Sequence, residues 1–207
     1  MALITASEAK DLIPSLTGTT DDTLLTTLTV RVSAAFARFC GYPPASVGVA
    51  PTMESASYVL EHDGSGTREL MLLAAPATAV SAARVDPTQD WTDDTYLVTA
   101  GTYAIVDGDR LRLKSTATQG TWTAGTRNVR VSFTAGYTTV PADLKHLAAR
   151  VVGYWYDQRQ IRGRSATTQG GQGGSVSATY RPEEGAEGLP DWARAELGAF
   201  ALGSRAA

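Results

Sequence analysis

The sequence predicts an α+β protein. Its expected parts are a small helical bundle (two N-terminal helices plus a long third helix), an inserted antiparallel β-hairpin region, and a flexible C-terminal arm ending in a short helix. Three observations lead to this prediction. Apolar residues recur at helical spacing before residue 41 and again after residue 141. Between these segments, short runs with period two alternate with turn residues. After residue 164, a stretch rich in Gly, Ser, Thr and Gln interrupts both patterns.

The first helix is expected over residues 5–13. Thr5-Ala6-Ser7-Glu8 has the sequence of a capping box. In this motif the Thr5 hydroxyl accepts a hydrogen bond from the Glu8 amide, and the Glu8 carboxylate accepts one from the Thr5 amide. Pro14 should end the helix, because the residue before a proline avoids the α conformation.

The second helix is expected over residues 21–40. Asp21 and Asp22 suit the positive N-terminal end of a helix. Gly41 supplies a C-terminal cap, and the prolines that follow it prevent continuation. A single apolar stripe runs along this segment and consists of Leu24, Leu28, Val32, Ala35, Phe36 and Phe39.

Residues 54–135 form the expected β-rich region. Turn residues between short β-prone runs predict two hairpins. The first joins Ser57–Glu61 to Arg68–Leu73, and the second joins Tyr103–Val106 to Arg110–Leu113. Further strands are expected at Val80–Val85, Tyr96–Val98 and Val129–Phe133. From Arg110 to Lys114 the chain alternates cations with leucines, as in a strand buried on one face.

The third helix is expected over residues 141–163, because proline is favoured in the first turn and Pro141 opens the segment. Its buried stripe should comprise Leu144, Leu147, Ala148, Val151 and Trp155. Residues 1–164 are thus predicted to form one body. A flexible linker, residues 165–175, connects this body to a C-terminal arm, residues 176–207, whose final helix should begin near Leu189-Pro190-Asp191-Trp192.

Composition limits the class of protein. The net charge of the 207 residues is -3, which does not predict a wholly basic nucleic-acid-binding surface. Cys40 is the single cysteine, so no intrachain disulfide can form, and a buried structural thiol is expected. The N-terminus does not resemble a secretion signal, and no apolar stretch reaches the length of a membrane span. We therefore expect a protein made and used without crossing a membrane.

No catalytic, cofactor-binding or metal-binding residues are predicted. His62 and His146 fall in neither a zinc pattern nor an HExxH motif, so both are expected to be structural or surface residues. The acidic residues around Trp91 lack the order of a calcium loop and predict a solvated turn; they are Asp86, Asp90, Asp93 and Asp94. The glycines of residues 170–174 lack the Lys-Ser/Thr of a phosphate loop and fit a linker.

Partner-binding residues are expected in the arm and at the end of the third helix. The arm's large side chains are candidate anchors, which dock either on the protein's own body or in a groove of another chain. These candidates are Tyr180, Leu189, Trp192, Leu197 and Phe200. Three roles remain open for a basic cluster: capping the third helix, pairing with a neighbouring acidic subunit, or contacting DNA phosphates. This cluster consists of Arg159, Arg162 and Arg164.

The order of these motifs resembles that of head–tail connector (adaptor) proteins of tailed bacteriophages. The run from Trp122 to Leu144 is similar to their strand–turn–helix signature, in which an aromatic-x-Ala-Gly-Tyr turn precedes a Val-Pro helix entry. Ile161-Arg162-Gly163 fits the end of that helix. The opening Thr-x-x-Glu helix, the second helix ending in Gly-Tyr-Pro and the C-terminal segment also resemble the family. The likeness covers nearly the whole chain, although the β-rich middle is long for the family.

The resemblance implies a structural subunit of the virion, without enzymatic activity, cofactor or membrane partner. It implies a homo-oligomeric ring of about twelve copies below the portal, at the neck between capsid and tail. Such a ring continues the DNA channel, with passing contact to the DNA, and binds a stopper or tail component on its other side. In the family, the C-terminal segment reaches the portal. The protein would be made in the host cytoplasm and then assembled into the particle.

Two alternatives remain open from the sequence. One is a different neck or tail-completion protein of the stopper type, for which a chain composed mainly of β-structure would be expected. The other is a β-rich carbohydrate-binding or enzymatic domain, in which one polar cluster would carry the activity. The long predicted helices favour the connector over the stopper.

Overall fold

The computed structural model describes residues 2–13, 19–92, 94–161, 166–171, 174–179 and 188–202, with the backbone alone for 159–161, 166–171 and 174–179. The chain forms two compact units. The helical unit contains Met1–Phe39 and Pro141–Ala201, and the β unit contains Cys40–Val140 and Leu202–Ala207. The predicted α+β class is confirmed, and the stretch that was predicted to be one body, residues 1–164, contributes to both units.

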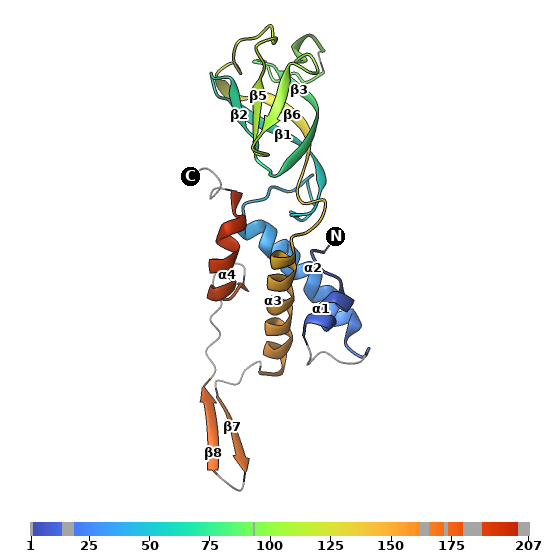
Figure 1. Ribbon diagram of the computed structural model, residues 1–207, viewed down its shortest axis with the longest axis vertical. Coiled ribbons are helices and arrows are strands. Elements are labelled where there is room, and N and C mark those ends of the chain that lie inside the picture. Colours follow the sequence, from blue (N-terminus) through green and yellow to red (C-terminus); the bar gives the residue numbers. More distant parts are fainter. Residues whose placement is uncertain are drawn as a thin grey trace. The chain divides into compact units, whose positions relative to one another are not determined.

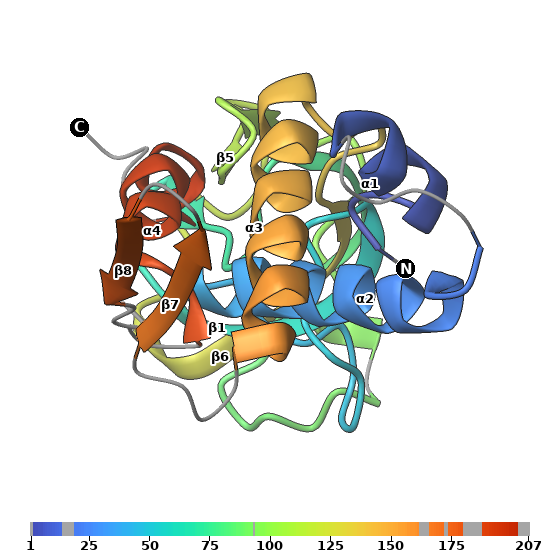
Figure 2. The same ribbon diagram turned by 90° about the horizontal axis from the view of Figure 1, so that it is seen from below.

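Four helices build the helical unit: α1 (Ala6–Leu12), α2 (Asp22–Phe39), α3 (Ala142–Ile161) and α4 (Asp191–Leu197). A 3₁₀ turn, Gly198–Phe200, continues α4. Helix α3 crosses α2, and α1 and α4 lie on opposite sides of α3 (Figures 1 and 2). The three helices predicted at residues 5–13, 21–40 and 141–163 are confirmed to within two residues at each end. The short helix of the arm begins at Asp191, within the run where its start was predicted.

A capping box fixes the start of helix α1, and an ion pair joins the helix to α3. The predicted capping box is present: the Glu8 amide donates to Thr5 Oγ1 at 3.1 Å, and the Thr5 amide donates to Glu8 Oε2 at 2.8 Å. The other Glu8 oxygen accepts from Lys145 Nζ of α3 at 2.6 Å. This contact, together with the bonds to Thr5, lowers the pKa of Glu8. One carboxylate therefore starts the helix and also joins it to α3.

The predicted apolar stripes form the packing surface between α2 and α3. On α2, Leu28, Val32 and Phe36 are buried, whereas Leu24 and Phe39 at its ends are half-buried. The stripe predicted for α3 is buried through its first four members, with its fifth, Trp155, half-buried. The guanidinium of Arg31 lies over the Trp155 ring at 4.8 Å from its centroid. Apolar spacing therefore predicted most of the buried face of each helix.

Six strands build the β unit: β1 (Ala56–Gly64), β2 (Glu69–Met71), β3 (Ala77–Val85), β4 (Tyr103–Val106), β5 (Arg110–Leu113) and β6 (Gly125–Ala135). They form two antiparallel sheets, ordered β1-β6-β3 and β2-β5-β4. One apolar core lies between them, with Trp122, Tyr58, Leu111 and Phe133 among its largest buried side chains. The Tyr58 and Phe133 rings stack at 5.7 Å between centroids.

The first predicted hairpin is wrong. Strands do form near Ser57–Glu61 and Arg68–Leu73, but they belong to different sheets: Tyr58 pairs with Phe133 of β6, and Leu70 pairs with Leu111 of β5. The loop between them crosses from one sheet to the other. It is held by a backbone bond from Gly66 N to the Trp122 carbonyl, 2.7 Å, rather than by a turn closing β1 onto β2.

The second predicted hairpin is confirmed. Strands β4 and β5 pair in register, from Tyr103 with Leu113 to Val106 with Arg110. Asp107 and Gly108 both have positive φ, 55° and 74°, as a tight turn between twisted strands requires. The strand predicted at Tyr96–Val98 is wrong, because Asp94–Tyr96 is a 3₁₀ turn that leaves only an isolated bridge to β3.

Two paired strands cover much of the segment predicted to be a flexible linker, residues 165–175, and continue into the predicted arm. Strands β7 (Ala166–Gly171) and β8 (Gly174–Thr179) pair antiparallel along their full length. Both strands contain threonine or valine, which favour extended backbone. The abundance of glycine led the sequence interpretation toward a coil, although glycine is also the usual residue at the tip of a hairpin.

The segments just before β1 and just after β6 lie side by side. Ser55 N donates to the Tyr137 carbonyl at 3.0 Å, and Tyr137 N donates to the Met53 carbonyl at 2.8 Å. Gly136 makes this approach possible, because its φ is +104° and a Cβ there would lie 2.3 Å from the Glu54 oxygen. The chain before β1 and the chain after β6 are therefore hydrogen-bonded to each other.

Candidate partner-binding site

Helix α4 packs on the protein's own helical unit. Leu189, Ala193 and Leu197 are fully buried, and α4 contacts both α3 and α2. Just before α4, the Gly188 carbonyl accepts a hydrogen bond from Trp155 Nε1 at 3.0 Å. Of the two interpretations of the arm, the structure therefore shows docking on its own body.

Trp192 lies at the edge of this contact and is half-buried. The guanidinium of Arg150 stacks over its ring at 4.4 Å from the centroid, and Tyr154 meets the ring edge-on. Arg150 also donates to Glu196 Oε1 at 2.8 Å. One arginine of α3 thus holds α4 through both a ring and a carboxylate, and one part of the indole remains accessible.

The predicted partner-binding residues have different positions in the structure. Leu189 and Leu197 face the helical unit, so they fix α4 in place. Trp192 and Phe200 retain accessible surface. Tyr180 lies outside the described residues, as do Arg162, Arg164 and the side chain of Arg159. Only the backbone of Arg159 is described, and it lies in the last turn of α3.

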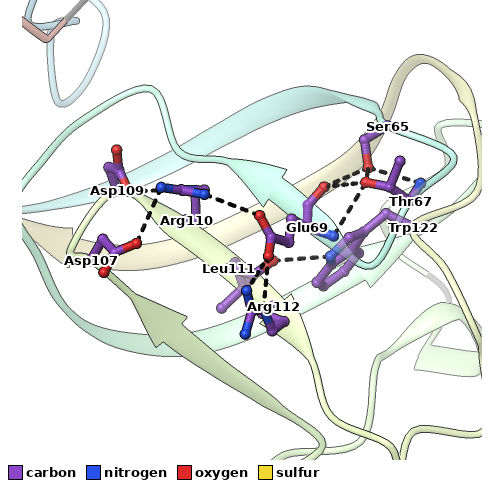
Figure 3. Close-up of polar contacts among 9 residues, drawn as sticks. All are labelled: Ser65, Thr67, Glu69, Asp107, Asp109, Arg110, Leu111, Arg112 and Trp122. Carbon is purple, nitrogen blue, oxygen red and sulfur yellow. Dashed lines mark hydrogen bonds and ion pairs between the residues drawn. The ribbon is translucent and has the colours of Figure 1, made fainter. Parts of the chain in front are cut away.

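A polar cluster on the β unit was not predicted as a site. Figure 3 shows Arg110 and Arg112 of β5 turned toward one carboxylate, Glu69 of β2. Glu69 accepts from Arg110 Nη1 at 3.2 Å and from Arg112 Nε at 2.8 Å. These bonds, with Arg112 contributing more, lower the pKa of Glu69. Arg110 also contacts Asp107 and Asp109 at 3.1 and 3.4 Å, so it is surrounded by carboxylates.

One buried indole and two exposed hydroxyls hold the backbone around this cluster in place. Trp122 is fully buried, and its Nε1 donates to the Leu111 carbonyl at 3.1 Å. At the start of β2, the hydroxyls of Ser65 and Thr67 donate to the Glu69 carbonyl at 2.6 and 3.0 Å (Figure 3). The alternation of arginine and leucine along β5 was visible in the sequence, but the pairing of β5 with β2, which brings Glu69 to the arginines, was not.

The acidic residues around Trp91 form turns, as predicted, but Asp86 is fully buried and not solvated. Asp86 Oδ1 accepts from both the amide and the hydroxyl of Thr88 at 2.7 Å, and Asp90 makes the corresponding contacts with Thr92. Asp94 pairs with Arg84 of β3, and Asp93 lies outside the described residues. Within the described part of the chain, no group of three or more Cys, His, Asp or Glu residues could hold a metal ion.

The two histidines differ in environment. His146 is exposed on α3. His62 is buried between the sheets beside Phe133, with a hydrogen bond to the backbone of Met71. Burial lowers the pKa of His62 to about 4. His62 therefore acts as a neutral core residue. Among the described helices, none is long and apolar enough to cross a membrane.

Comparison with known proteins identifies the family. No curated protein matches the chain. The chain does match the family described as Head completion protein over residues 2–194, which covers most of both units and the first four residues of α4. The predicted resemblance to bacteriophage connector and completion proteins is thus confirmed at the level of the family. The chain belongs to the Head completion protein family, a family of structural proteins of the bacteriophage head.

Proposed function

We propose that this protein is a non-catalytic neck subunit that forms a ring, of about twelve copies, below the portal. The ring joins capsid to tail and continues the DNA channel. The family match over nearly the whole chain is the observation that carries this proposal. The resemblance of residues 122–144 to the connector signature supports the more specific assignment as an adaptor.

In this proposal, α4 contacts the portal from its docked position. Leu189 and Leu197 hold the helix on α3, so they are not available to a partner without rearrangement. Trp192 and Phe200 keep accessible surface beside them. A rigid aromatic group that is already positioned loses little conformational entropy on binding, and such groups dominate many interfaces.

Portal attachment of a Trp192→Ala variant tests this role. The expected loss is about 2 kcal/mol, or about 30-fold in affinity for purified portal rings. Ala195→Gln, at an exposed position on the same helix, serves as a matched control and should bind normally. Unchanged binding of Trp192→Ala, with the helix still docked, would remove this residue from the interface.

The position of the subunit in the particle tests the proposal as a whole. Electron microscopy of virions should show a ring in contact with the portal. A ring separated from the portal by another protein would indicate a stopper or tail-completion subunit. Density within the head shell or the tail fibres would contradict both assignments.

A further inference from the structure

The outer face of the β2-β5-β4 sheet carries a short row of cations. Leu111 and Leu113 point into the core and are fully buried, so Arg110, Arg112 and Lys114 lie on the opposite face. Met71 of β2 is directly opposite Arg110 in the register and is half-exposed. Arginine beside an exposed methionine is a combination enriched in protein–protein interfaces.

Charge on this face is unevenly distributed. Near Arg110 it is balanced by Glu69, Asp107 and Asp109. Toward the other end, Arg112 shares Glu69 with Arg110 and keeps 53% of its side chain exposed. Lys114 is also exposed, and within the residues that the structure describes it makes no ion pair. The Arg112–Lys114 end is therefore a basic surface whose arginine is already held in position.

A polypeptide carboxylate fits this surface better than a nucleic-acid backbone does. Glu69, Asp107 and Asp109 would repel phosphates running along β5. The exposed methionine offers contact area that a phosphate chain would leave uncovered. An arginine that uses only some of its N–H donors to bind one carboxylate can bind a second carboxylate with the others.

Helix α1 carries a matching surface. Asp11 and Leu12 form its last two residues, and both are exposed. A negative charge in the last turn of a helix is unfavourable, because the helix dipole is negative there. Within the described part of the chain, no cation pairs with Asp11. The end of α1 thus combines an uncompensated acid with an exposed leucine.

We propose that these two surfaces bind each other between copies of the protein. The α1 end (Asp11 and Leu12) of one copy contacts the β5 face of the next, where Arg112 and Lys114 form the basic end and Met71 lies opposite Arg110 at the other end. Because each copy carries both surfaces at different places, the contact is head-to-tail, as a closed ring requires. The inference rests on the proposed ring and assigns one of its subunit contacts.

Charge reversal at Lys114 and at Asp11 tests the contact. Both side chains are exposed, so neither substitution should disturb the fold of the unit that carries it. Lys114→Glu and Asp11→Lys should each raise the protein concentration needed for ring formation on purified portal rings by about tenfold or more. Asp11→Lys also places a favourable charge at the end of α1, so lost assembly cannot reflect a weaker helix. Asp157→Lys, at another exposed carboxylate, is the matched control. Ring formation is measured by sedimentation velocity at low salt.

The double variant, Lys114→Glu with Asp11→Lys, should restore assembly. The proposed contact would be wrong if either single variant assembled like the parent protein. It would also be wrong if the double variant assembled as poorly as the single variants. Neither result would contradict the ring proposal. A parent protein that forms no ring with portal would instead contradict the proposed function. Loss of DNA binding in Lys114→Glu, without loss of assembly, would reassign the surface to nucleic acid.

A disulfide test distinguishes contact between copies from contact within one. In a Cys40→Ser background, Asp11→Cys with Arg112→Cys should give a covalent ladder of oligomers on oxidation of assembled rings. A crosslinked monomer, or no crosslink in intact rings, would contradict the assignment.

Discussion

The helical unit is built from both ends of the chain, whereas the β unit is built almost entirely from its middle. In the helical unit, each helix forms through signals within its own segment: a capping box for α1 and apolar stripes for α2 and α3. In the β unit, β1 pairs with β6 across more than sixty residues. The two units therefore depend on different interactions, and substitutions should separate them.

The largest expected effect is on the β unit. Trp122→Ala removes a fully buried indole and its hydrogen bond to the Leu111 carbonyl, where the two sheets meet. Such a truncation costs about 3–5 kcal/mol in the free energy of unfolding. Hydrogen exchange should show lost protection in β1, β5 and β6 with little change in α2 and α3. Equal loss in both units would show that they unfold as one.

The second largest expected effect is the loss of stability of the β unit at low pH. The pKa of His62 is lowered from 6.5 to about 4 by burial, so the folded state disfavours the protonated ring. Stability due to His62 is therefore complete above pH 6.5 and is lost as the pH falls toward 4, by an amount on the order of 3 kcal/mol. Denaturant unfolding at stepwise pH values measures this effect.

A His62→Gln variant is the control for this acid effect. It keeps a side-chain donor for the Met71 backbone but does not titrate, so its stability should change much less between pH 6.5 and 4.5. Glu8, Glu61 and Glu69 have lowered pKa values, so their stabilisation is lost only at lower pH. A variant with the same pH dependence as the parent protein would exclude His62 as the cause.

Loss of a buried leucine from α4 should have a smaller and local effect. Leu197→Ala removes about 2–3 kcal/mol of packing from a seven-residue helix that cannot stand alone. The helix should undock before the rest of the helical unit unfolds, which protease cleavage near residue 190 would detect. Ala199→Ser, exposed in the following turn, is the control. Cleavage no faster than in the parent protein would show that α4 needs little of this packing.

The smallest expected effect is at the start of α1. Thr5→Ala removes the side-chain half of the capping box and should destabilise the helical unit by about 1 kcal/mol. Thr5→Ser keeps the hydroxyl and should retain most of that stability. Thermal unfolding of the helical unit measures the stability of both variants. If Thr5→Ala instead lowered the melting temperature of the β unit, the two units would not unfold independently.

The same division explains what the sequence could predict. The helices could be located to within two residues because their caps, stripes and stops are local, as with Thr5 and Gly41. Most strands were also located, but the pairing of β1 was not, because Tyr58 and Phe133 are brought together by the fold and not by neighbouring sequence. The hairpin of β7 and β8 was missed because glycine-rich sequence suits coil and tight turn alike.

The candidate sites follow this pattern. The arm residues were proposed from their apolar character, which is the property that buries Leu189 and Leu197 on the protein's own α3. Whether such residues face their own body or a partner depends on a surface that another segment supplies. The Glu69 cluster was missed because β2 and β5 lie some forty residues apart and meet only in the sheet.

The isolated bridge between Glu54 and Tyr137 ties together the two ends of the segment that lies between them. A segment whose ends are tied together can be lengthened, replaced or deleted with only a short bridge left between the flanking helices. Related phages could therefore vary the size of this segment while they keep the helices that precede and follow it. The same position is a place to graft a foreign domain onto this protein, entered after residue 53 and left at residue 137.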